Sequence, residues 1–198
     1  MPARNRRDNG ESVFSYLESG SRPEHRIAVT ASADALVLGV LSSQQHVQWA
    51  LSAGGTLEDR PVYNKSLCFE TFLFPAEDTG LTPDLSDHIR DLAEQLDAHR
   101  KARQAGFEAV TLTGLYNVVA KLRSGEALTA KDKLLHEQGL VSVLRTLHDD
   151  LDAAVLRAYG WADLGPVPWA DEPAHQAWTE ALLQRLVALN ARRAAEEA

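Results

Sequence analysis

The chain of 198 residues contains a single cysteine, Cys68, so no disulfide can form within it. This sparse use of cysteine fits a reducing compartment, and we expect a cytoplasmic protein. No apolar run approaches the roughly 20 residues that a membrane-spanning helix needs. The polar N-terminus also lacks the apolar core of a secretion signal. The sequence therefore argues against a disulfide-rich secreted domain and against a membrane partner.

Basic residues are also scarce, since 20 Lys and Arg face 28 Asp and Glu and the formal net charge is −8. Duplex DNA is a dense polyanion, and tight binding to it normally needs a clustered basic surface. We therefore expect the chain alone to bind DNA weakly at most. Hydrophobic residues make up 44% of the chain, which is ordinary for a globular protein with a substantial core.

Three regions differ in composition and periodicity. Residues 1–25 are rich in Arg, Asn, Gly, Ser and Glu, and we expect a disordered leader. Residues 26–77 are typical of a small α+β unit, and residues 81–197 are typical of an α-helical region. The predicted fold class is α+β but mainly α, with a small α/β unit followed by a C-terminal helical bundle or hairpin.

Within the small unit, the alternation of β-branched residues predicts a strand at 27–30. Residues 33–53 follow a helical period and stop at Gly54. Leu67 and three phenylalanines before Pro75 predict an extended, strand-like segment packed on that helix. The same aromatic run could instead form a platform on which bases stack.

The helical region begins at Thr82, a good N-cap followed by proline. A second helix is expected over 113–123, with Gly125 at its end, and Thr129 resembles the start of a capping box. One long helix should follow Thr129, and a last helix should follow Asp171. Leucines spaced by four and three residues predict the buried seam of the long helix: Leu140, Leu144, Leu147 and Leu151.

Several strings in the chain are specific enough to carry a family resemblance. They are LGVLSSQQHVQWALSAGG (38–55), YNKSLCFETFLFP (63–75), TGLYNVVAKLRSGE (113–126), LLHEQGL (134–140), YGW (159–161) and LVALNARRAAEE (186–197). Together they resemble the C-terminal region of the single-chain type IIG/IIL restriction-modification DNA methyltransferases, in the segment that follows the target-recognition domain. The resemblance covers most of residues 26 to 197.

This resemblance implies a non-catalytic C-terminal segment of a bacterial DNA (adenine) methyltransferase, which supports target recognition and packs against the catalytic body. The cofactor of that class, S-adenosylmethionine, would be bound by the body. The chain has no Gly-x-Gly turn for such a cofactor and no Asn-Pro dipeptide for a target amine. It also has no Asp-x-Lys or Glu-x-Lys triplet for a nuclease metal ion. We therefore expect no catalytic, cofactor-binding or metal-binding residues in this chain.

For DNA contact, the best candidates are Arg60, Tyr63, Asn64 and Lys65, which combine hydrogen-bond donors with an aromatic ring. They lie where the resemblance is densest, although the resemblance does not identify them as base readers. His46 lies one helical turn before Trp49 and could make a stacking contact. A partly buried histidine beside a core tryptophan is the simpler interpretation.

Two further groups have structural interpretations. His148 and Asp152, four residues apart on a helix, have the spacing of a metal-binding pair, but a solvated acidic face explains them more simply. Arg100, at the end of a helix, is explained by the helix dipole, and Cys68 should be a buried structural thiol.

The partner implied by the resemblance is a methyltransferase body or another protein chain. The competing hypotheses are a stand-alone helical protein-interaction module and a degenerate gene remnant. A neighbouring reading frame for a methyltransferase body would favour a split subunit over both.

Overall fold

The computed structural model describes residues 13–16, 32–57 and 60–196. This part of the chain is mainly helical, which confirms the prediction of a mainly α fold. Its elements, in chain order, are α1 (Ala35–Ser42), α2 (Gln44–Ala53), β1 (Gly55–Leu57), β2 (Arg60–Val62), the π-helical turn η1 (Lys65–Phe69), α3 (Pro83–Gly106), α4 (Leu112–Ser124), α5 (Ala130–Gly139), α6 (Val141–Ala158), the 3₁₀ turn η2 (Ala162–Leu164) and α7 (Glu172–Glu196).

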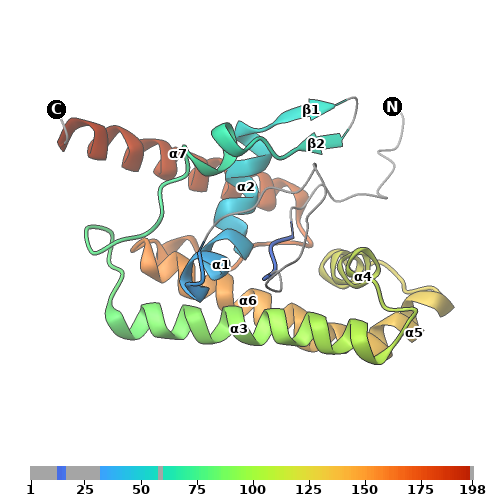
Figure 1. Cartoon of the computed structure of the whole chain (residues 1–198). Helices are drawn as coiled ribbons and strands as arrows, with labels where there is room; N and C mark the ends of the chain where they lie inside the picture. Colours follow the sequence, from blue (N-terminus) through green and yellow to red (C-terminus); the bar gives the residue numbers. More distant parts are fainter. Residues whose placement is uncertain (1–12, 17–31, 58–59, 197–198) are drawn as a thin grey trace.

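Two long helices, α3 and α6, form the base of the molecule and pack along one another (Figure 1). The short helices α1 and α2 lie over them, with α1 against α3 and α2 against α6 and α7. Helices α4 and α5 pack together at one end of this base, and α7 lies across the opposite side from α3 (Figure 1). The sequence predicted a small unit (26–77) followed by a helical region (81–197). In the structure, helices α1 and α2 of the first region pack directly on α3, α6 and α7 of the second.

The predicted seam of α6 is buried as its spacing indicates. Leu144 and Leu151 have no exposed surface, and Leu147 is 9% exposed. They face α3, whose own buried stripe includes Ile89, Leu92 and Leu96 and follows the same four-three spacing. Both stripes belong to one continuous hydrophobic core.

Leu140 was predicted to belong to that buried seam, and this prediction is wrong. The single long helix expected after Thr129 is in fact two helices, and Leu140 joins them with a left-handed backbone (φ 45°). Gly139 allows this junction, because a Cβ there would lie 2.3 Å from Leu115 Cδ2. The turn carries Leu140 off the buried face, and it is 45% exposed.

The helix expected over 33–53 is also divided. Its break is at Ser43, which is buried in an extended conformation (ψ 158°) between α1 and α2. Ser43 Oγ donates to the Val40 carbonyl at 2.7 Å, and the first amide of α2, on Gln44, donates to Asp152 Oδ1 at 2.8 Å. A carboxylate of α6 thus caps α2 from a distance of 108 residues in the chain.

The predicted helix boundaries fare well where a cap marks them. Thr82 caps α3 ahead of Pro83, and Thr129 with Asp132 forms the capping box of α5. Gly125 ends α4 with a left-handed φ of 71°, and Asp171 Oδ1 accepts from the amide of Ala174 at the start of α7.

The extended segment expected over 57–75 is largely wrong. Its residues form the short antiparallel pair β1–β2, then the turn η1, and then irregular backbone. Phe72 is buried in the main core, as the structural interpretation of the aromatic run expected. The described residues show no separate α/β unit, because this pair has only three residues on each side. The strand expected at 27–30 lies outside the described residues.

Two other predictions concern regions that are only partly described. Of the leader expected at 1–25, only residues 13–16 lie within the described part, and they pack against the helices. Across the described residues, no helix combines the length and apolar character required to cross a bilayer.

We predict that Leu147→Ala will lower the free energy of unfolding by roughly 2–5 kcal/mol, since it removes buried surface and leaves a cavity. The matched control is Leu134→Ala, because Leu134 is 50% exposed on α5 and should cost no more than about 0.5 kcal/mol. Urea denaturation of both variants measures the difference. Equal midpoints would show that the α6 stripe is not core.

Candidate functional site

The four residues predicted to contact DNA lie together at the hairpin and the turn that follows it. Arg60 begins β2, and its side chain lies outside the described part of the structure. Asn64 caps η1, because its side-chain oxygen accepts from the amide of Ser66 at 3.0 Å. Lys65 Nζ lies 3.0 Å from Glu70 Oε1, and this ion pair holds the pKa of the Glu70 carboxyl below its ordinary value.

Tyr63 has a structural contact in this group. Its hydroxyl lies 3.0 Å from Nε2 of His46, and the two rings stack at 5.7 Å with an interplanar angle of 13°. Burial raises the pKa of Tyr63, so the phenol stays protonated. Among the side chains of this group that the structure describes, Lys65 carries the charge that could meet a phosphate, with 61% of its side chain exposed.

His46 is more deeply buried than the sequence indicated. It has no exposed surface, and it packs against Phe72 at 4.6 Å between ring centroids. Trp49 is only partly buried and donates from Nε1 to Thr71 Oγ1 at 3.3 Å. His46 Nδ1 has no hydrogen-bond partner among the described residues. These contacts make His46 a core residue and leave no face of its ring for a nucleic-acid base.

Cys68 is buried, as expected for a structural thiol. Its Sγ lies 3.6 Å from the carbonyl oxygen of Ala50, and burial raises the pKa of the thiol. A raised pKa reduces the thiolate that nucleophilic chemistry would need.

A second polar cluster lies where the sequence indicated two surface features. Arg100, expected as an exposed cation at a helix end, is buried, and so are His148 and Asp152, expected on a solvated acidic face. The hydroxyl of Tyr116 lies 2.8 Å from His148 Nε2, and Arg100 Nη2 contacts both. Burial, followed by the neighbouring charge of Arg100, keeps the pKa of His148 well below its ordinary value.

The spacing of α3 already contained the signal for this burial. Arg100 stands four residues after Leu96 and eight after Leu92, so it continues the apolar stripe of the helix. A guanidinium on that stripe must find acceptors inside the protein. His148 and Asp152 likewise follow the buried leucines of α6.

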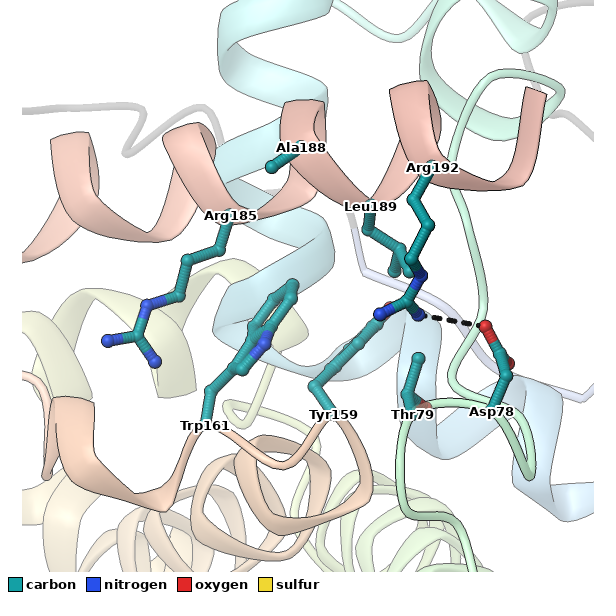
Figure 2. A pocket seen from close by; sticks show the side chains of 8 residues that line it. All are labelled: Asp78, Thr79, Tyr159, Trp161, Arg185, Ala188, Leu189 and Arg192. Carbon is teal, nitrogen blue, oxygen red and sulfur yellow. Dashed lines mark hydrogen bonds and ion pairs between the residues drawn. The ribbon is translucent and has the colours of Figure 1, made fainter. Parts of the chain in front are cut away.

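The structure also contains a half-open cavity of about 310 Å³ that the sequence did not predict (Figure 2). One wall is α7, and the other is the segment that follows α6 together with the loop before α3. Its lining residues are Asp78, Thr79, Tyr159, Trp161, Arg185, Ala188, Leu189 and Arg192. The rings of Tyr159 and Trp161 stack at 4.5 Å with an angle of 13° between them.

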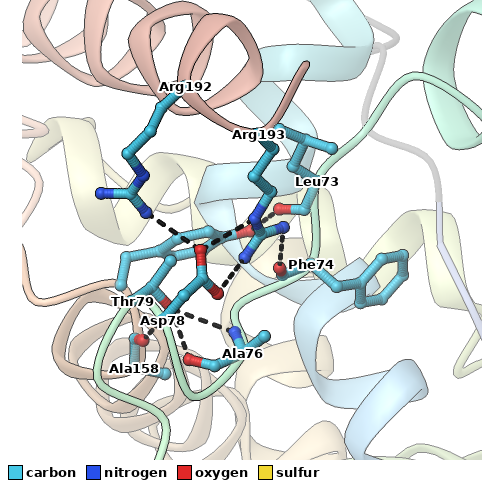
Figure 3. A network of polar contacts seen from close by, with 9 residues as sticks. Leu73, Phe74, Ala76, Asp78, Thr79, Ala158, Arg192 and Arg193 are labelled. Carbon is cyan, nitrogen blue, oxygen red and sulfur yellow. Dashed lines mark hydrogen bonds and ion pairs between the residues drawn. The ribbon is translucent and has the colours of Figure 1, made fainter. Parts of the chain in front are cut away.

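The arginines around this cavity already have carboxylate partners. Arg192 and Arg193 both donate to Asp78, with Arg193 Nη2 at 2.7 Å from Asp78 Oδ1 (Figure 3). Arg185 donates to both oxygens of Asp163, at 2.7 and 2.5 Å. These pairs satisfy the guanidinium groups, and Arg193 holds the pKa of Asp78 below its ordinary value.

Backbone contacts show that the same network fastens a loop. Arg193 Nη1 donates to the carbonyl of Phe74 at 3.0 Å, and the buried Tyr159 hydroxyl donates to the carbonyl of Leu73 at 2.6 Å. Thr79 Oγ1 donates to the carbonyl of Ala158 at 2.8 Å (Figure 3). The network therefore ties the loop before α3 to the end of α6 and to α7.

The polar side chains of this cavity are engaged in packing contacts. The cavity of Figure 2 has paired charges and aromatic walls, and its carboxylate and hydroxyl side chains, on Asp78, Thr79 and Tyr159, all make hydrogen bonds within the fold. Within the described ranges, no three carboxylate, histidine or cysteine side chains gather to hold a metal ion.

His46 predicts an acid-sensitive fold. Burial lowers the pKa of His46 from 6.5 to about 3. Between these pH values, His46 is protonated in the unfolded chain and neutral in the folded chain. The contribution of His46 to the free energy of unfolding is therefore fully present above pH 6.5. It is lost as the pH falls towards 3, by up to about 1.4 kcal/mol per pH unit. Between pH 7 and pH 4.5, the free energy of unfolding should fall by roughly 2–3 kcal/mol less in His46→Gln than in the unaltered chain, as measured by denaturation at both pH values. Equal losses would mean that His46 becomes charged in the folded protein.

Lys65 predicts the character of any DNA binding. We expect Lys65→Ala to weaken the binding of several unrelated duplexes by a similar factor and to reduce the salt slope by about one, because a phosphate contact is lost. Lys131→Ala, which removes an exposed cation on α5, is the control and should change little. Anisotropy titrations across a range of salt concentrations measure both. A tight, salt-resistant and sequence-specific complex would contradict the prediction.

No protein-family model, curated protein or solved structure matches this chain significantly. The resemblance to restriction-modification methyltransferases therefore rests on the sequence strings alone.

Proposed function

We propose that this chain is a non-catalytic C-terminal segment of a bacterial restriction-modification DNA (adenine) methyltransferase. In this role it packs against the catalytic body and supports recognition of the DNA target, while the body binds S-adenosylmethionine and performs the methyl transfer. The observation that carries the proposal is the position of the longest resembling string, because its residues 38–48 are all buried where α1 and α2 pack on the long helices.

The residues of that string act through packing. Gly39 lies so close to α3 that a Cβ would stand 2.7 Å from Ile89 Cγ2. Ser43 and Gln44 are buried at the break between α1 and α2, and Gln45 Nε2 donates to the backbone carbonyl of Asp152 at 3.3 Å. A string with these contacts specifies how a module folds, which fits a supporting segment better than an active site.

A surface for the catalytic body is available beside the predicted DNA-contact residues. Leu51, Val62 and Leu67 are each between 40% and 46% exposed, and they come from α2, β2 and η1. These three elements meet around Gly54, where a Cβ would lie 2.9 Å from the Val62 carbonyl oxygen and 3.2 Å from Cys68 Sγ. We assign the body to this hairpin corner, since large exposed apolar side chains favour a protein partner.

The same position explains how an acidic chain could assist DNA recognition. Lys65 lies next to the hairpin corner, and the chain carries a net charge of −8. A body docked on Leu51, Val62 and Leu67 would place Lys65 at the edge of a larger, shared DNA surface. The body would then supply most of the phosphate contacts.

The test is complementation of a methyltransferase of this class that has been cut after its target-recognition region. Added to this truncated body, the chain should bind it and restore adenine methylation, measured as transfer of tritiated methyl groups to DNA. The chain alone should transfer none. Leu67→Asp should reduce binding and restored activity at least about tenfold, which corresponds to about 1.4 kcal/mol.

Leu134→Asp is the matched control, because it places the same charge on an equally exposed leucine of α5. It should leave complementation unchanged. Binding without any dependence on Leu67 would move the interface elsewhere, and failure of the folded chain to bind the truncated body would overturn the proposal.

A further inference from the structure

A short piece of the chain itself packs on α1, α2, α3 and Tyr63, and the surface that it covers is called the groove. Residues 13–16, Val-Phe-Ser-Tyr, lie in an extended segment on the surface of the helices. Val13 and Ser15 are exposed, and Phe14 and Tyr16 are partly buried and pack against a small buried cluster of Ala35, Leu38 and Ala93. Asp97 and Arg100, which contact the segment through hydrogen bonds, are buried.

Two charged side chains of α3 grip the backbone and the serine of this segment. Arg100 Nη1 donates to the carbonyl of Phe14 at 2.8 Å. Asp97 Oδ1 accepts from the hydroxyl of Ser15 at 2.7 Å and lies 3.4 Å from the amide nitrogen of Tyr16. Asp97 and Arg100 are 6% and 2% exposed, so their charged groups stand in a nearly dry site aimed at the segment.

Two aromatic contacts flank these polar ones. The Phe14 ring meets the rings of His46 and Tyr63 edge to face, with centroids 5.4 and 5.6 Å away. On the other side of Ser15, the Tyr16 ring lies 5.9 Å from Nζ of Lys101, which also pairs with Asp97 at 2.6 Å. The groove therefore reads an aromatic residue, a hydroxyl residue and a second aromatic residue in succession.

Part of the groove's interior is held by contacts that do not involve the segment. Tyr116 and His148 contact the guanidinium of Arg100 from α4 and α6, and Lys101 neutralises Asp97 from the same helix. Arg100 Nε has no hydrogen-bond partner among the described residues. Without the segment, Asp97 would keep Lys101, and Arg100 would keep Tyr116 and His148, so each buried charged group would retain a polar partner inside the bundle.

We propose that this groove is a peptide-binding site for an extended aromatic–hydroxyl–aromatic segment, and that residues 13–16 are its intramolecular ligand. The ligand class follows from the contacts: an aromatic side chain between His46 and Tyr63, a backbone carbonyl at Arg100, and a serine or threonine hydroxyl at Asp97. A tethered ligand has an effective concentration that can reach the millimolar range, so it excludes weaker peptides added from solution.

The test uses the full chain and a labelled peptide with the sequence of residues 11–18, ESVFSYLE. Phe14→Ala removes the aromatic anchor of the tethered ligand, and Ser15→Asp sets a carboxylate against Asp97. Both should empty the groove and raise the affinity for the peptide at least about tenfold over the unaltered chain. Fluorescence anisotropy measures the affinity, and a cooperative denaturation curve shows that each variant is folded.

Three controls connect binding to the groove. Val13→Asp adds the same charge to the same segment but away from Asp97, and should leave the groove closed. A peptide in which alanine replaces its phenylalanine should bind at least about tenfold more weakly to the emptied chain. Asp97→Asn, combined with Phe14→Ala, should weaken the peptide similarly, because a neutral amide is a poorer acceptor for the serine hydroxyl.

Two results would overturn the proposal. If Phe14→Ala and Ser15→Asp both abolish cooperative folding, residues 13–16 are an integral part of the fold and not a ligand. If both variants fold and neither binds the peptide more tightly than the unaltered chain does, the groove has no affinity for the segment in solution. Neither result depends on the methyltransferase proposal, since the peptide test requires no catalytic body.

Discussion

The hydrogen bond from the Gln44 amide to the buried carboxylate of Asp152 is the contact on which the arrangement of the molecule depends. It satisfies the first amide of α2 at a break that would otherwise leave a helix start unpaired inside the protein. It also fixes the direction of α2 relative to α6. From that direction follow the position of the hairpin, the burial of His46 and the contact of α2 with α7.

Sequence periodicity and local caps predicted much of the helical region. The stripes of α3 and α6 needed only their own spacing, and the starts of α3 and α5 needed only a threonine with suitable neighbours. The breaks at Ser43 and Leu140 could not be found in the same way. At the Ser43 break, the amide of Gln44 donates to Asp152, which lies 108 residues further along the chain. At Leu140, the turn depends on the close approach of Gly139 to Leu115. Both are tertiary effects that override a continuous helical pattern.

The candidate sites show the same division. Arg60, Tyr63, Asn64 and Lys65 were predicted as a group because they combine hydrogen-bond donors with an aromatic ring. In the structure, Tyr63 has a packing contact, Asn64 a capping contact and Lys65 an ion pair with Glu70. The groove that holds residues 13–16 was not predicted, since its polar contacts come from α3, more than 80 residues from the segment that fills it. Polar residues on an apolar stripe, such as Arg100 and His148, were the available signal, and they were interpreted as surface features.

The long helix α7 is held in two physically different ways along its length. Its middle is anchored by buried apolar side chains, whose packing does not depend on ion pairing: Trp178, Leu182, Leu186 and Leu189. Its last turns are anchored mainly by the pairing of Arg192 and Arg193 with the partly exposed Asp78. Added salt screens such pairs and leaves apolar burial intact or strengthens it. Raising the ionic strength should therefore weaken only one end of the helix. Its terminal turns should fray and exchange their amide hydrogens while its centre remains protected.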